Sequence, residues 1–206
     1  MGLFITIEGP EGSGKTTVAK KVVEQLETEG YKVLYTREPG GVGIAEKIRD
    51  IILDVNNTNL DPRSEALLYA ASRRQHLVQR VLPALAEGKV VVCERFIDSS
   101  LAYQGYGRQI GFDEVLSINK FAIGDTFPDI TIYLDVNEEV GLSRIKNRKF
   151  KDRLDVESIE FHHHVNEGYA KVVETFKDRI RVVDASKPLE EVVKTSYAIV
   201  KGMLND

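Results

Sequence analysis

Gly9 and Gly14 are separated by four residues and are followed by Lys15 and Thr16, a pattern whose residue types suit a triphosphate. Backbone N–H groups can wrap phosphates closely only where glycines let the chain approach them. A lysine adds positive charge at the outer phosphates, and a threonine hydroxyl can reach the magnesium ion that they carry. The predicted phosphate-binding residues are Gly9, Pro10, Glu11, Gly12, Ser13, Gly14, Lys15, Thr16 and Thr17.

Strand and helix patterns on either side predict the elements that position this loop. Residues 3–8 form an apolar run of strand length, and residues 15–29 carry apolar side chains on one helix face until Gly30 ends the pattern. A nucleotide-binding loop requires this order of strand, loop and helix. The alternative, a glycine-rich turn with a surface lysine, does not explain that order.

The rest of the chain continues to alternate strands with helices. Strands are predicted at residues 31–36, 89–94, 129–136 and 179–184, with helical patterns between them. This alternation predicts an α/β fold of the P-loop NTPase-like kind, in which helices flank a five-stranded parallel sheet in three layers. Because 42% of the 206 residues are hydrophobic, we expect residues 1–206 to form a single domain.

The charge balance and the single cysteine limit the classes of function. The net charge is -4, which predicts no general surface for a polyanion and hence no nucleic-acid partner. Cys93 stands alone in an apolar run, so no disulfide within the chain is possible. No apolar stretch is long enough to span a bilayer and no signal segment opens the chain, so we expect a cytoplasmic protein without a membrane partner.

Charged residues follow two predicted strands, at the sheet edge where ligands of parallel sheets bind. Glu38 comes after the second strand, in a turn that suits either a ligand or a solvated ion pair. Glu94 and Arg95 end the third strand, where an acid can orient the magnesium shell and an arginine can meet a phosphate. A surface pair between Glu94 and Arg95 is the alternative.

A long helix is predicted from Asp61 and Pro62 to about Gln79, and it places Tyr69 and Arg73 on one face. Pro83 is expected to kink this helix before Gly88 ends it. A tyrosine one turn before an arginine suits a platform for a base with a hydrogen-bonding fork, or core packing beside a surface charge.

Six cationic side chains surround one aromatic between Arg144 and Arg153. So dense a basic run is commonly a solvated surface. Next to helices in a phosphate-loop protein, it favours a short helical lid, at about residues 143–155, that closes on the transferring phosphates.

The remaining motifs separate three classes of phosphate-loop protein. A guanine-nucleotide switch needs Asn-Lys-x-Asp, but the nearest run, residues 119–122, is Asn-Lys-Phe-Ala. A nucleotide-binding module without catalysis predicts loss of Lys15, of the second acid or of the lid arginines, and all are present. The spacing therefore favours a small kinase that moves a phosphoryl group from ATP to a small acceptor.

Motifs along nearly the whole chain carry a family resemblance. They are residues 9–17, 36–41, 71–74, 94–100, 102–105, 128–129 and 152–155. Together they closely resemble bacterial thymidylate kinases. The resemblance implies transfer of the ATP γ-phosphate to dTMP, giving dTDP for dTTP biosynthesis, with Mg²⁺ and a homodimer packed through helices. Another nucleoside monophosphate kinase, a deoxynucleoside kinase and, less favoured, the non-catalytic module are the alternatives.

The resemblance also implies which residues bind the acceptor. They are Glu38, Arg49, Tyr69, Arg73, Arg95, Ser100, Tyr103 and Gln104. By this match Tyr69 stacks on thymine, Arg73 and Gln104 bind its edge, and Ser100 lines the same pocket. Tyr103 corresponds to the aromatic that crowds the 2′ position of the sugar and disfavours ribose.

The remaining roles concern the phosphates. The residues expected in catalysis are Lys15, Glu11, Arg95, Arg148 and Arg153, and those expected at the metal are Thr16 and, through water, Glu94. By the resemblance Arg49 and Arg95 hold the acceptor phosphate, and Glu11 addresses the acceptor sugar while the lid arginines supply positive charge. The chain departs from the family's usual Asp-Arg-Tyr at the third strand, where it has Glu94, Arg95 and Phe96.

Overall fold

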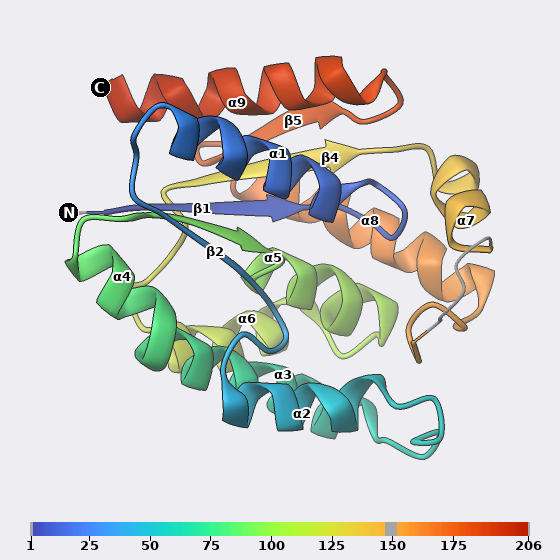
Figure 1. The fold of residues 1–206 in the computed structure, drawn as a ribbon. Helices are drawn as coiled ribbons and strands as arrows, with labels where there is room; N and C mark the ends of the chain where they lie inside the picture. The colour runs from blue at the N-terminus through green and yellow to red at the C-terminus, as the bar shows by residue number, and fades with distance from the viewer. Residues whose placement is uncertain (1, 147–151, 206) are drawn as a thin grey trace.

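The computed structural model describes residues 2–146 and 152–205. Within these residues five strands form one parallel sheet, in the order β2-β3-β1-β4-β5 (Figure 1). The strands are β1 (Leu3–Glu8), β2 (Val33–Arg37), β3 (Val90–Glu94), β4 (Ile130–Asp135) and β5 (Ile180–Asp184). The five strand predictions are confirmed.

Helices pack on both faces of the sheet and make three layers (Figure 1). One face is covered by α1 (Lys15–Thr28) and α9 (Leu189–Asn205), and the other by α3 (Pro62–His76), α6 (Phe112–Ile123) and α8 (Ile159–Thr175). Other helical segments are α2 (Gly43–Leu53), η1 (Leu77–Val81), α4 (Leu82–Ala86), α5 (Ile97–Ser100), η2 (Leu101–Gly107) and α7 (Glu138–Lys146). None of the helices in the described part of the chain is both long and apolar enough to cross a membrane.

The strands send apolar side chains to both faces of the sheet. In β1, Phe4 belongs to the core on the α8 side, whereas Ile5 and Ile7 belong to the core on the α1 side. All five residues of β3 are buried, as expected for a parallel sheet covered on both faces. The predicted three-layer fold is confirmed, and it brings the carboxyl ends of β1, β2 and β3 side by side.

The long helix after α2 begins at the predicted residues. Asp61 Oδ1 accepts a hydrogen bond from the Ser64 N–H at 3.0 Å, and Pro62 takes the first helical position. The predicted interruption near Pro83 takes the form of a wider π turn, η1, directly before α4. A proline ring clashes with the carbonyl four residues earlier, here Gln79, and the wider turn at that point relieves the clash.

Candidate active site

The phosphate loop connects β1 to α1 at the carboxyl edge of the sheet (Figure 1). Gly12 and Gly14 have φ angles of 75° and 90°, which side chains disfavour. A Cβ atom on Gly12 would lie only 2.3 Å from the carbonyl oxygen of Gly141 on α7. The loop therefore needs glycine at this position both for its conformation and for its contact with α7.

Lys15 is buried beneath the loop that it follows. Its Nζ donates hydrogen bonds to the carbonyl oxygens of Gly9 at 3.0 Å and of Pro10 at 2.7 Å. Burial and the neighbouring charge of Arg95 lower the pKa of Lys15 to about 7. Lys15 is thus held by loop carbonyls, and the negative charge of a phosphate would favour its ammonium form.

Thr16 and Glu94 lie together beside the loop. Thr16 Oγ1 donates to Glu94 Oε2 at 2.7 Å, and the hydroxyl of Tyr35 on β2 donates to Glu94 Oε1. Mg²⁺ takes oxygen ligands and retains several waters, so a hydroxyl and a carboxylate next to bound phosphates fit this ion. The structure brings the two predicted metal residues together and adds Tyr35, which sequence reasoning did not single out.

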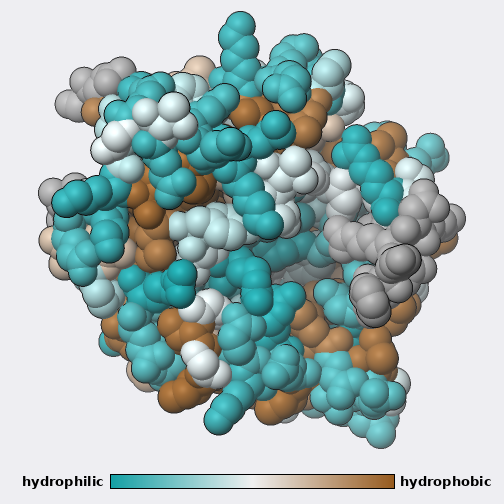
Figure 2. Space-filling view, viewed as in Figure 1, coloured by the Kyte–Doolittle hydropathy of each residue, from teal (hydrophilic) through white to brown (hydrophobic). Residues whose placement is uncertain are grey.

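Two adjoining hollows open at the carboxyl edge of the sheet. The donor hollow lies over the phosphate loop, and the acceptor pocket lies beside it. The residues that line both are Glu11, Glu38, Arg49, Arg95 and Asp152. The face drawn in Figure 2 is hollowed beside the grey atoms, and mostly hydrophilic side chains surround this hollow. A ligand in the acceptor pocket would therefore face a nucleotide on the phosphate loop.

All residues predicted for the acceptor come together around one hollow. Glu38, Arg49, Tyr69, Arg73, Arg95, Ser100, Tyr103 and Gln104 line the acceptor pocket. Of the residues predicted for catalysis, Glu11 and Arg95 line both hollows and Lys15 lines the donor hollow.

Arg95 stands at the junction of the two hollows in a strained backbone conformation. Its φ angle is 62°, in the left-handed region that residues with a side chain rarely adopt. Its guanidinium forms an ion pair with Glu11, donates to Ser99 Oγ at 3.1 Å and lies 4.9 Å from the centre of the Tyr103 ring. Backbone strain of this kind concentrates at functional sites, and here it accompanies an arginine held between the donor loop and the acceptor pocket.

Arg73 is 1% exposed and has a nearly complete set of partners. Its Nε donates to Glu38 at 2.7 Å, its Nη1 to Ser100 at 3.0 Å and to Asn119, and its Nη2 to the Phe96 carbonyl at 2.9 Å. A guanidinium has five N–H groups, so these four bonds to described residues leave one N–H on Nη2 for a ligand. The fixed plane of Arg73 thus offers the pocket a single hydrogen-bond donor.

Glu38 is held from behind by a buried histidine. His76 Nδ1 lies 2.9 Å from Glu38 Oε1, and His76 Nε2 lies 2.7 Å from Thr36 Oγ1. Burial opposes the charge on Glu38, but Arg73 and His76 outweigh it and lower the pKa of this carboxyl. The carboxylate that orients Arg73 is therefore itself fixed on two sides.

Tyr103 and Gln104 reach the pocket from the π-helical segment η2, in a region where the sequence predicted helical patterns but no π turn. A π turn is wider than an α turn and often occurs at functional sites. Here it lets two consecutive residues line the same hollow. Both residues were expected at the acceptor through the family resemblance, which assigned Tyr103 to the sugar and Gln104 to the base edge.

The lid arginines differ from expectation. Arg144 Nη1 donates to the carbonyl oxygen of Gly12 at 2.9 Å, so this arginine reaches the phosphate loop. Arg148 lies outside the described residues. Arg153, predicted to reach the transferred phosphate, instead donates to the Ile52 carbonyl at 2.8 Å and forms an ion pair with Glu65. A buried carboxylate needs a cationic partner, and this need accounts for the position of Arg153.

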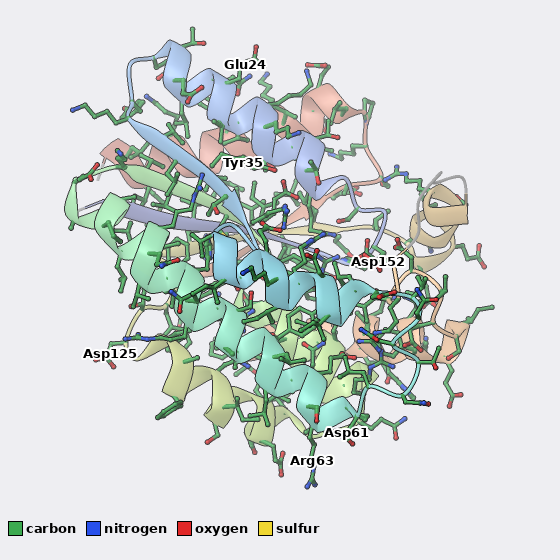
Figure 3. The ribbon with its side chains drawn as sticks, turned by 60° about the horizontal axis from the view of Figure 1, so that its bottom comes forward. Glu24, Tyr35, Asp61, Arg63, Asp125 and Asp152 are labelled. Atoms are coloured by element: carbon green, nitrogen blue, oxygen red, sulfur yellow. The ribbon has the colours of Figure 1, made fainter. Side chains whose placement is uncertain are left out.

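Several residues of the acceptor pocket were missed by sequence reasoning. They are Pro39, Leu53, Ser99, Asp152 and Leu154. Asp152 belongs to the predicted lid segment and lies near the end of α2, where the Arg153 N–H donates to the Leu53 carbonyl at 3.1 Å (Figure 3). Glu65 was missed too, although it precedes Tyr69 by one helical turn and so shares its face, which was a usable signal.

A family model, Thymidylate kinase, matches residues 7–195. The chain belongs to the thymidylate kinase family. Among curated members of this family, thymidylate kinase from Bacillus velezensis is 57% identical, with 98% of this chain and 97% of the relative covered. Thymidylate kinase from Clostridium novyi is 54% identical, with 98% of each chain covered.

A solved member of the family has the same fold. The crystal structure of thymidylate kinase from Ehrlichia chaffeensis matches with a TM-score of 0.79 at 32% identity, over 97% of this chain and 98% of that chain. Agreement over nearly the full length of both chains confirms the resemblance that the sequence motifs indicated.

Proposed function

We propose that the protein is an ATP-dependent nucleoside monophosphate kinase that transfers the γ-phosphoryl group of ATP to dTMP, giving dTDP and ADP. The observation that carries this proposal is the shared wall of the two hollows, in which Arg49 and Arg95 lie between the phosphate loop and the acceptor pocket. Two arginines at this junction can hold an acceptor phosphate in line with the γ-phosphate, and such positioning supplies most of the catalysis in phosphoryl transfer.

The pocket walls suit a thymine base. Tyr69 supplies an aromatic face, and Arg73 and Gln104 supply polar contacts to the base edge. A two-point polar contact discriminates strongly, because a wrong base leaves buried polar groups without partners. Tyr103 stacks below Arg95 next to Glu11, where its ring would crowd a ribose 2′-hydroxyl.

On the donor side, the protein's own groups would stabilise charge as the phosphoryl group moves. Lys15 would exchange its loop carbonyls for the outer phosphates, and Arg95 would align the acceptor phosphate. Thr16 and Glu94 would hold Mg²⁺, which when bound neutralises phosphate charge. Among the lid arginines in the described residues, Arg144, which donates to the Gly12 carbonyl, would approach the phosphates.

The family resemblance also supports a homodimer, and the exposed apolar side chains suggest where it forms. Leu67 on α3 is 56% exposed, and Phe121 on the neighbouring helix α6 is 93% exposed. Burying such side chains against a second copy would remove apolar surface from water.

We further propose a single domain with its lid at about residues 143–155. The protein would act in the cytoplasm, where one buried cysteine needs no disulfide partner.

The acceptor is tested by measuring ADP release with ATP and Mg²⁺ against dTMP, dUMP, UMP, dAMP, dGMP and thymidine. We expect strong turnover with dTMP, little with UMP and none with thymidine. If another monophosphate were preferred, a related nucleotide kinase would be the better assignment. Absence of turnover with every acceptor would favour the non-catalytic module.

A further inference from the structure

Glu65 is a fully buried carboxylate behind the acceptor pocket, with 0% of its surface exposed. It lies on α3, one turn before Tyr69. Its Oε1 accepts a hydrogen bond from Gln104 Nε2 at 2.8 Å, and its Oε2 accepts from Arg108 Nε at 3.1 Å and from Arg153 Nη2. Three donors from three separate segments therefore converge on one carboxylate.

This arrangement decides which end of the Gln104 amide faces the pocket. A carboxylate between two guanidinium groups is negatively charged and can only accept hydrogen bonds, so the NH₂ end of Gln104 must face Glu65. Gln104 is 1% exposed and lines the acceptor pocket, so its amide oxygen is turned toward the ligand. The pocket then offers an acceptor from Gln104 and a donor from Arg73.

We propose that Glu65 is a positioning residue that fixes the amide of Gln104 and thereby selects thymine over cytosine, an inference that rests on the proposed function. Thymine presents an N3–H donor beside its O4 acceptor, which matches the acceptor of Gln104 and the donor of Arg73. Cytosine presents the reverse, an N3 acceptor beside an amino donor, and both contacts fail. Without Glu65 the amide can turn over and meet N3 of cytosine with its NH₂ group.

Arg108 and Arg153 hold the carboxylate that holds Gln104. Arg108 also pairs with Glu157 at 2.5 Å, and Arg153 is anchored at the Ile52 carbonyl, so neither cation is free to leave Glu65 easily. A purely structural ion pair is the competing explanation. It predicts that loss of Glu65 lowers stability without changing the choice of base.

The test is the kinetics of Glu65→Gln with dTMP and with dCMP, beside calorimetric affinities for both nucleotides. We expect the preference for dTMP over dCMP, as a ratio of kcat/KM, to fall by at least about tenfold. The loss should arise mainly as a higher KM for dTMP with a smaller change in kcat, because Glu65 acts through Gln104 on base binding.

The matched control is Asp98→Asn. Asp98 is another buried carboxylate, paired with Arg179 at 2.6 Å outside the residues that line the pocket. Its replacement should lower the thermal midpoint and leave the dTMP to dCMP ratio unchanged. If Glu65→Gln does not fold, Glu65→Asp keeps the charge between the arginines while withdrawing it from the amide, and a smaller fall in the ratio is expected.

Two failures can be told apart. A wild-type protein that does not use dTMP contradicts the proposed function and with it the role of Glu65. A wild-type protein that prefers dTMP, with variants at Glu65 that lose stability and keep the wild-type ratio, contradicts the role of Glu65 alone.

Discussion

The acceptor pocket and the donor hollow differ in how their charged groups are paired. At the acceptor pocket, Arg73 in its wall and Glu65 behind it are buried and bonded mostly to other side chains, which leaves few atoms to change partners. At the phosphate loop, Lys15, which lines the donor hollow, and Arg144 on α7 are bonded to backbone carbonyls of the loop itself. A network in which nearly every polar atom is already bonded holds the base-binding side chains in a fixed geometry. Cations that are bonded to neutral carbonyls can instead exchange these carbonyls for phosphates.

Lys15→Ala should give the largest effect and acts on the donor side alone. We expect kcat to fall by about 10³-fold, because a lost charge contact to the moving phosphoryl group is not replaced by water in a closed site. The affinity for dTMP should change little, since Lys15 does not line the acceptor pocket. Steady-state kinetics give the first quantity and calorimetry with dTMP the second.

Lys20→Ala is the control for this variant, because Lys20 lies on the same helix and is exposed. It should leave kcat near the wild-type value. Wild-type turnover in Lys15→Ala would contradict the role given to the loop lysine and to the donor hollow as a whole.

Arg73→Lys tests the hydrogen-bonded side-chain network at the acceptor pocket. A lysine has three donors on one nitrogen and cannot form the fork that joins Glu38, Ser100 and the Phe96 carbonyl. We expect KM for dTMP to rise by about 10- to 100-fold and the thermal midpoint to fall, with a smaller change in kcat. Arg74→Lys, at an exposed neighbour with one hydrogen bond to the Ala122 carbonyl, should change neither quantity much. Equal kinetics in Arg73→Lys and wild type would contradict the claim that base binding depends on the hydrogen-bonded network around Arg73.

The two regions also differ in how far the sequence predicted them. The phosphate loop depends on neighbours within nine residues, so glycine spacing and the flanking strand and helix identify it. Tyr69 and Arg73 were recognisable because they are four positions apart on one helix and so share a face. Charged pairs that join distant segments carry no such local signal.

Arg153 illustrates what local pattern cannot decide. In the sequence it ends a basic run, which predicts a lid that faces phosphate. In the structure it pairs with Glu65, 88 residues earlier in the chain, because that carboxylate is buried and needs a cation. Burial of Glu65 depends on the packing of α3 against η2, and the π turn that sets this packing was not predicted.

The pH dependence of nucleotide binding is the smallest expected effect. It tests whether Lys15 exchanges its loop carbonyls for phosphate when a nucleotide binds. Burial and Arg95 lower the pKa of Lys15 to about 7, while Glu11, Glu8 and Glu94 act in the opposite direction. Bound phosphate favours the ammonium form, so above pH 7 nucleotide binding should take up a proton and affinity should fall by up to about tenfold per pH unit.

The stability of the nucleotide-free protein should depend on pH with the opposite sign. The unfolded chain holds the Lys15 proton up to its ordinary pKa of 10.5, so this group makes stability rise with pH between about 7 and 10.5.

Calorimetry of ATP binding from pH 7.5 to 9, in two buffers of different ionisation enthalpy, measures both the affinity and the proton uptake. Lys15→Ala serves as the control, because it keeps every other titrating group, including Glu8, whose pKa burial and Asp98 raise to about 7. The slope of affinity with pH should be steeper in the wild type than in this variant. Equal slopes would mean that Lys15 keeps one protonation state with and without nucleotide. This result would contradict the proposal that Lys15 exchanges loop carbonyls for phosphate with a change in its charge.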